Sequence, residues 1–250
     1  MTGSVRWTRR VGAAGAAAVG AAAAVQALPA LAAVPAIRLR LWPGLSGVGD
    51  PDHVALTFDD GPDPASTPRF LDVLAAHQVR ATFFLLGSML ARAPGLGRDL
   101  AGAGHEIAVH GWDHRYLPLR GPVATYDDLA RARNLAAETT GTAPVFFRPP
   151  YGVLSAAAVR AARRLRLRPV LWTAWGKDWT RHATPYSVLQ TVRADLAGGG
   201  TVLLHDSDCT SAHGAWRSAL GALPALLDGC AERGLRVGPL GQHGPPTTPP

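Results

Sequence analysis

The 250-residue chain is poor in lysine and cysteine, and both shortages limit what it can be. Lys177 is the only lysine, so basic charge comes from arginines that are scattered or lie on predicted helices, without aromatic residues between them. This pattern is typical of a solvated helix surface, and no nucleic-acid partner is expected. Repeats of the length found in solenoids and propellers are also missing. The length suits one large α/β domain or two small ones.

Only two cysteines, Cys209 and Cys230, are present, and they do not have the spacing of a metal site. In an exported protein two cysteines can form a disulfide, and the sequence leaves this pairing open. The formal net charge is +7. A mildly basic surface would favour an anionic polymer such as cell wall.

Residues 1–34 have the composition of a signal peptide or an N-terminal anchor. A basic start that includes Arg9-Arg10 precedes an apolar run rich in Ala and Gly, and Ala30-Leu31-Ala32 is a small-residue cleavage site. The arginine pair resembles a twin-arginine export signal. An uncleaved anchor is the alternative, although the glycines and Pro29 disfavour a stable membrane span. Both interpretations predict a secreted or cell-envelope protein that touches a membrane only through an uncleaved leader.

The remaining chain divides into a linker, one domain and a tail. Residues 35–50 are expected to form an irregular linker, and residues 51–240 a single, monomeric domain. Residues 241–250 are rich in Pro, Gly and Thr, which predicts a disordered tail.

Within the domain, apolar runs alternate with segments of helical spacing about seven times. The expected strands are 54–58, 81–86, 105–109, 145–147, 169–173, 201–204 and 235–237. Such alternation predicts parallel strands that are joined by right-handed helical crossovers. Polar clusters follow five of the strands, which favours a barrel of (β/α) units over an open sheet with a single switch point.

The first strand runs into two adjacent carboxylates and a turn, in Thr57-Phe58-Asp59-Asp60-Gly61-Pro62. Such a sequence also suits a plain turn. In a barrel, however, the carboxyl ends of all strands open at one mouth. Polar groups from several strand ends would meet there: Asp59, Asp60, His110, His114, Arg148, Asp178 and His205.

One carboxylate and two imidazoles are the usual ligands of an open zinc site, and Asp60, His110 and His114 supply them. The same set could hold non-haem Fe(II). Oxygen chemistry at iron would give Asp59 and His205 no evident role, whereas hydrolysis uses both residues. A divalent metal, with zinc as the expected ion, would polarise a carbonyl and acidify a water.

In this hydrolytic interpretation Asp59 is the general base and His205 protonates the leaving group. Arg148 would pair with Asp59 and hold it ionised. A backbone N–H near Tyr151 would complete the oxyanion site. An apolar wall would come from Trp179 and Leu203.

Five sequence blocks, in their order and spacing, resemble the polysaccharide deacetylase family, which is carbohydrate esterase family 4 or the NodB-homology domain. The blocks are TFDDGP (57–62), HGWDH (110–114), RPPYG (148–152), DW (178–179) and LLHD (203–206). The resemblance covers about residues 52–240. It implies a distorted (β/α)7 barrel, a divalent metal that is usually zinc, and hydrolysis of N- or O-acetyl groups on sugar polymers.

By position, the resemblance assigns the family's functional residues to this chain. The base matches Asp59, the acid matches His205, and the residue that orients the base matches Arg148. The metal ligands match Asp60, His110 and His114, and the positions around the acetyl group match Tyr151 and Leu203.

The chain departs from the family pattern at two positions. Gly111 stands where Ser or Thr usually follows the first His, and Trp175 replaces an Asp that tunes the acid His. A carboxylate near His205 would raise its pKa and keep it protonated. The candidates for this task are Asp178, Asp206 and Asp208. We hypothesise an active site in which the tuning of the acid is altered, and we include Asp178 among the catalytic residues.

The sequence thus favours an exported metal-dependent deacetylase of an acetylated glycan, such as peptidoglycan or a chitin-like oligomer. A catalytically impaired glycan-binding barrel, suggested by Trp175, is one alternative, and an amidase on a small non-sugar amide is another. A glycosidase is disfavoured, because adjacent Asp59 and Asp60 cannot flank a glycosidic bond at the necessary separation.

Overall fold

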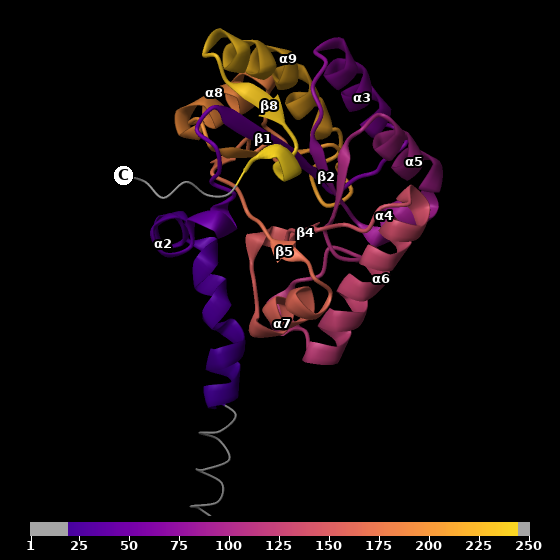
Figure 1. Ribbon diagram of the computed structural model, residues 1–250, viewed down its shortest axis with the longest axis vertical. Helices are drawn as coiled ribbons and strands as arrows, with labels where there is room; N and C mark the ends of the chain where they lie inside the picture. Colours follow the sequence, from indigo (N-terminus) through magenta and orange to yellow (C-terminus); the bar gives the residue numbers. More distant parts are fainter. Residues whose placement is uncertain (1–19, 245–250) are drawn as a thin grey trace, which may run out of the picture.

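The computed structural model describes residues 20–244, and residues 1–19 and 245–250 lie outside that range. A single sheet of parallel strands, with helices around it, forms the body of the molecule (Figure 1). Its strand order is β5-β4-β3-β2-β1-β7-β6, and β8 pairs with β1. The strands are β1 (His53–Asp59), β2 (Thr82–Leu85), β3 (Glu106–Val109), β4 (Phe146–Phe147), β5 (Arg168–Pro169), β6 (Ala174–Trp175), β7 (Thr201–His205) and β8 (Arg236–Gly238).

Helices follow most of the strands and carry the chain back to the start of the next one. They are α2 (Pro35–Leu41), α3 (Thr67–Ala76), α4 (Gly87–Arg92), α5 (Pro94–Gly102), α6 (Pro122–Thr140), α7 (Ala156–Arg164), α8 (Pro185–Asp195) and α9 (Trp216–Glu232). The predicted α/β fold of parallel (β/α) units in one domain is confirmed.

Strand β1 is the central strand, and each of its residues is buried. Ala55 pairs with Thr201 of β7 and with Gly238 of β8, so β8 lies on the edge of β1 that β2 uses farther along. Both faces of β1 are covered, which explains why its sequence is a nearly continuous apolar run.

The sheet curls but does not close, because β5 and β6 form its two edges within the described residues. The single strand predicted over 169–173 is therefore wrong. The carbonyls of Val170 and Leu171 accept hydrogen bonds from the Arg148 side chain, and that of Trp172 accepts one from Arg38. The guanidinium groups of Arg148 and Arg38 thus make the hydrogen bonds that the backbone of a neighbouring strand would otherwise make. The sheet stays open here and forms a half-barrel.

The largest apolar cluster lies between the sheet and the helices α3, α8 and α9. At its centre the ring of Phe58 stacks on Phe83 with centroids 4.9 Å apart and meets Phe70 edge-on at 5.2 Å. Burial of such rings contributes about 2–3 kcal/mol each. This packing fixes β1, and therefore the position of the acidic residues at its end.

Residues 26–46 contact the body of the molecule, whereas residues 20–25 are exposed. Residues 20–27 are helical, and η1 (Leu28–Ala33), α2 and η2 (Pro43–Ser46) follow. The irregular linker predicted over 35–50 is therefore wrong for most of its length. The buried Arg38 explains the order of this segment, because its guanidinium donates to the carbonyl of Ala32, the hydroxyl of Ser46 and the carbonyl of Trp172.

Within residues 20–244 the structure has no single helix that is long and apolar enough to cross a membrane. Gly20–Ala33 and Pro35–Leu41, bent by 92°, pass that test only as a pair. The start of the predicted leader, residues 1–19, falls outside the described residues, and the leader stays a prediction.

The C-terminal segment is ordered farther than predicted. The turn η5 (Leu240–Gln242) is followed by the buried His243, whose ring contacts the carbonyls of Gly47 and Gly199. A disordered tail from residue 241 is therefore wrong for 241–244, and 245–250 lie outside the described range.

The two cysteines are both free thiols, so the disulfide that the sequence left open is not formed.

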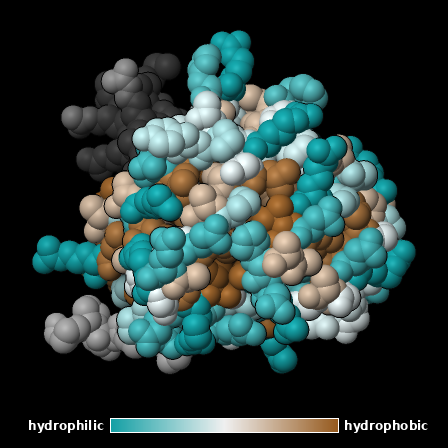
Figure 2. Space-filling model, turned by 90° about the horizontal axis from the view of Figure 1, so that it is seen from above, coloured by the Kyte–Doolittle hydropathy of each residue, from teal (hydrophilic) through white to brown (hydrophobic). Residues whose placement is uncertain are grey.

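Seen from above α9 and α3, the surface shows apolar areas between hydrophilic side chains (Figure 2). The monomeric state stays a prediction.

Candidate active site and metal centre

The carboxylates of Asp59 and Asp60, at the end of β1, both face the imidazole of His110. In a regular strand, successive side chains point to opposite faces. Here the backbone of Asp60 is left-handed, with φ 79°, a conformation that Asp tolerates better than most residues. As a result Asp59 Oδ2 and Asp60 Oδ1 lie 3.7 and 3.6 Å from His110 Nε2.

Asp60, His110 and His114 form a set of ligand atoms that fits a divalent cation. These atoms all lie within 4.8 Å of one another, and His114 Nε2 is 3.6 Å from Asp60 Oδ1. Asp60 Oδ1 is buried and has no hydrogen-bond partner among residues 20–244. A bare buried carboxylate oxygen is costly, and a cation between these three groups would satisfy it.

Both imidazoles are in the right protonation state to bind a metal. Burial, together with nearby His114, lowers the pKa of His110 to about 3, and burial also lowers the pKa of His114. His110 Nδ1 lies 2.9 Å from the carbonyl of Arg148, so it carries the proton and leaves Nε2 free as a ligand. The second oxygen of Asp60 accepts a hydrogen bond from Thr210, a residue that the sequence did not indicate.

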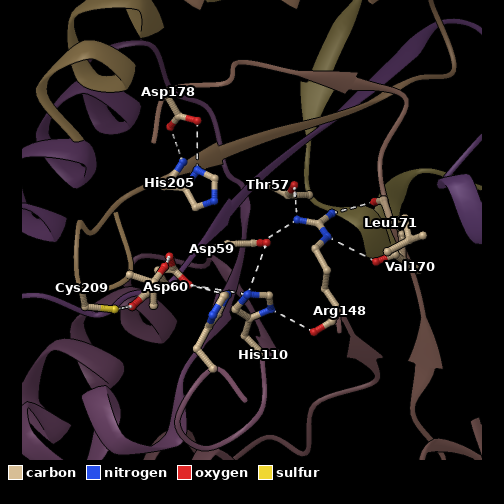
Figure 3. A network of polar contacts seen from close by, with 12 residues as sticks. Thr57, Asp59, Asp60, His110, Arg148, Val170, Leu171, Asp178, His205 and Cys209 are labelled. Carbon is tan, nitrogen blue, oxygen red and sulfur yellow. Dashed lines mark hydrogen bonds and ion pairs between the residues drawn. The ribbon is translucent and has the colours of Figure 1, made fainter. Parts of the chain in front are cut away.

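Asp59 is paired with Arg148, which is completely buried (Figure 3). Arg148 Nη1 donates to Asp59 Oδ1 at 2.7 Å and to the Thr57 hydroxyl at 2.8 Å. Burial raises the pKa of Asp59, while the charge of Arg148 opposes that rise. The Arg148 guanidinium also donates to the backbone carbonyls of Val170 and Leu171, between β5 and β6. These bonds fix the guanidinium, and the guanidinium in turn fixes the orientation of the Asp59 carboxylate.

His205, at the end of β7, is bound to Asp178 by two contacts. Asp178 Oδ1 lies 2.9 Å from His205 Nδ1, and Oδ2 accepts from the His205 backbone N–H at 2.7 Å (Figure 3). Burial lowers the pKa of His205, but the carboxylates of Asp178, Asp60 and Asp59, of which Asp178 contributes most, together outweigh burial and raise this pKa to about 10. The other two carboxylates considered have different partners, since Asp206 accepts from Thr67 and Asp208 from the N–H of Gly214.

A cavity of about 390 Å³ joins these groups, and it is lined by Asp59, His110, His114 and His205. Its walls include the predicted Tyr151, Trp179 and Leu203, together with Trp172 and Trp175. Trp175 lies between the other two indoles, with ring centroids 5.5 Å from Trp172 and 6.2 Å from Trp179. Trp175, which stands where the family pattern has an Asp, thus adds an aromatic ring to the cavity wall.

Seven of the ten predicted site residues line this cavity, and the other three, Asp60, Arg148 and Asp178, contact residues that do. Thr57, Thr210 and Trp172 were not given a role from the sequence. Thr57 could have been, because it lies two residues before Asp59 and therefore on the same face of β1. Thr210 lies on the loop between β7 and α9, where no helical or strand periodicity in the sequence could have indicated which way its side chain points.

A family model described as polysaccharide deacetylase matches residues 46–170. This chain belongs to the polysaccharide deacetylase family. The family that the five blocks resembled is thereby confirmed. A curated member, the chitooligosaccharide deacetylase of Bradyrhizobium sp., is 34% identical over 197 residues, which are 76% of this chain and 89% of the relative.

Other relatives of this family are longer. The peptidoglycan-N-acetylglucosamine deacetylase PgdA of Listeria monocytogenes is 35% identical over 160 residues, which are 64% of this chain. The match takes up 34% of PgdA, so this chain spans about a third of that relative.

Solved structures of this family share the fold of curled parallel sheet and helices. The Bc1960 peptidoglycan N-acetylglucosamine deacetylase has a TM-score of 0.74 and 28% identity, over 80% of this chain and 91% of that chain. A mutant of BA3943 from Bacillus anthracis, described as a family 4 pseudoenzyme with restored activity, has a TM-score of 0.70 and 26% identity, over 77% and 67%.

Proposed function

We propose that this protein is an extracytoplasmic, metal-dependent deacetylase of N-acetylated glycans. One observation carries the proposal: a carboxylate held by a buried guanidinium and an imidazole held by a carboxylate line the same cavity, beside three side chains arranged as metal ligands. Hydrolysis of an amide needs a base, an acid and a polarised carbonyl, and these groups supply or support each of them.

Asp60, His110 and His114 would hold the cation. When bound, it would polarise the acetyl carbonyl and acidify a water, and zinc is the ion that this ligand set favours. Asp59 accepts the proton of the attacking water as the new C–O bond forms. The charge and hydrogen bonds of Arg148 keep Asp59 aimed at that water.

His205 completes the reaction as the general acid. Its Nδ1 is engaged by Asp178, which leaves Nε2 to donate a proton to the leaving nitrogen as the C–N bond breaks. The products are acetate and a glycan with a free amine. An O-acetyl substrate would need the same proton on its leaving oxygen.

A glycan is the best-supported substrate. The cavity wall carries three indoles and an exposed tyrosine ring, and aromatic rings of this kind suit the apolar faces of a sugar chain. The relatives are named for peptidoglycan and chitooligosaccharide, which also favours a polymer outside the cytoplasm.

A catalytically impaired barrel, as in the pseudoenzyme relative, is not favoured. Trp175 suggested that alternative because the usual tuning carboxylate is absent there. Asp178 lies in hydrogen-bond contact with His205 instead, so the acid has a carboxylate partner.

The test is acetate release from a panel of chitin oligomers, peptidoglycan fragments, O-acetylated glycans and a small N-acetylated amide. We expect release from an N-acetylated glycan, loss of release with a chelator, and recovery on addition of zinc. Asp59→Asn should lower kcat/KM by at least about 10²-fold. Zinc binding without acetate release would favour a binding protein, and turnover of the small amide alone would favour an amidase.

A further inference from the structure

The loop 110–114 carries both imidazole ligands, and its shape decides whether they converge. It leaves β3 with Gly111 at φ 86° and ends with His114 at φ 56°, both left-handed. The first residues of α4 hold one side of it: the N–H groups of Gly87 and Ser88 donate to the carbonyls of Gly111 and Trp112 at 2.9 and 3.0 Å.

The other side of this loop is held by Asp128 of α6. Asp128 is 7% exposed, and its Oδ2 accepts the backbone N–H of Trp112 at 2.8 Å. Its Oδ1 lies 3.8 Å from Arg120 Nη1. The peptide groups on both sides of Trp112, midway between the two ligands, are therefore fixed by α4 and by this one carboxylate.

Gly111 allows this close approach. A Cβ atom at this position would lie 3.0 Å from Asp128 Oδ2, which is tighter than almost all such contacts, and φ 86° disfavours any side chain. With the Ser or Thr usual in the family, the carboxylate of Asp128 would have to move by a few tenths of an ångström.

We propose that Asp128 is a positioning residue for the metal site, which it serves by holding the loop 110–114 so that His110 and His114 both face Asp60. The inference rests on the proposed metal site, and Asp128 itself contacts neither the metal ligands nor the cavity. Removal of its carboxylate would free the Trp112 N–H and let the two imidazoles move apart.

The test measures metal binding directly. We expect Asp128→Ala to weaken zinc affinity by about 10–100-fold in a chelator competition. The visible spectrum of the cobalt(II)-substituted protein should change as well, because that spectrum reports ligand geometry. Asp128→Asn keeps an acceptor oxygen and should recover part of the affinity. Asp127→Ala, the exposed neighbour on the same helix, should match the unaltered chain.

Wild-type affinity and an unchanged cobalt spectrum in Asp128→Ala would overturn the inference, even if the variant were less stable. Should Asp128→Ala not fold, Gly111→Ala serves as a second variant, since its Cβ would press on the Asp128 carboxylate and should weaken zinc binding too. The proposed function fails separately, if the unaltered chain binds zinc but releases no acetate.

Discussion

At the scale of single residues, Asp178 is the carboxylate that contacts His205, the proposed general acid. Both of its oxygens are used on His205, one on the ring and one on the backbone N–H. The family's usual position, Trp175, instead joins the aromatic wall of the cavity. We therefore propose that the tuning carboxylate is Asp178, three residues after the end of β6.

The pH–rate profile of Asp178→Asn tests this assignment. The Asp178 carboxylate, with smaller contributions from Asp60 and Asp59, raises the pKa of His205 to about 10 against the opposing effect of burial, so the acid keeps its proton below that pH and loses it as the pH rises through it. Without the negative charge, the pKa of His205 falls. We expect the basic limb of kcat/KM to move at least about one pH unit lower and the rate to fall about 10²-fold. An unchanged profile would exclude Asp178 as the tuning group.

At the scale of elements, hydrogen bonds from two buried arginines explain why the strand predicted over 169–173 does not form. The run 169–173 is apolar and β-branched enough to predict a strand, but its carbonyls are bound by Arg148 and Arg38 from distant segments. Local pattern cannot show such contacts. The ends of β1, β3 and β7 were predictable because a buried apolar run stops abruptly at a charged residue, as at Asp59 and His205.

Arg38→Met tests whether α2 and η2 belong to the domain. The substitution leaves three acceptors without their donor: the carbonyls of Ala32 and Trp172 and the hydroxyl of Ser46. We expect the free energy of unfolding to fall by about 2–4 kcal/mol in urea titration. Arg40→Met, an exposed change on the same helix, should stay within about 0.5 kcal/mol. Equal stability of the two variants would restore the linker interpretation.

At the scale of the whole molecule, the site depends on long-range assembly. Asp60 follows β1, the two imidazoles follow β3, and Thr210, which holds the second oxygen of Asp60, follows β7. The parallel arrangement places these strand ends together, and that was predictable from the alternation of strands and helices. The contact of Thr210 with Asp60 and that of Asp128 with the backbone of Trp112 were not predictable, since each comes from a loop or a helix whose own pattern indicates only local structure.

Because the metal ligands meet only in the folded chain, metal binding should stabilise the whole domain. An ion that binds the native state alone adds about 2.7 kcal/mol at a hundred times its Kd. For a chain of this size we therefore expect zinc to raise Tm by about 5–10 °C. Asp59→Asn should keep this shift while it loses activity, since Asp59 lies outside the ligand set. Asp60→Ala should lose both, and a shift that persists in Asp60→Ala would mean that zinc binds elsewhere, so the three side chains would not be its site.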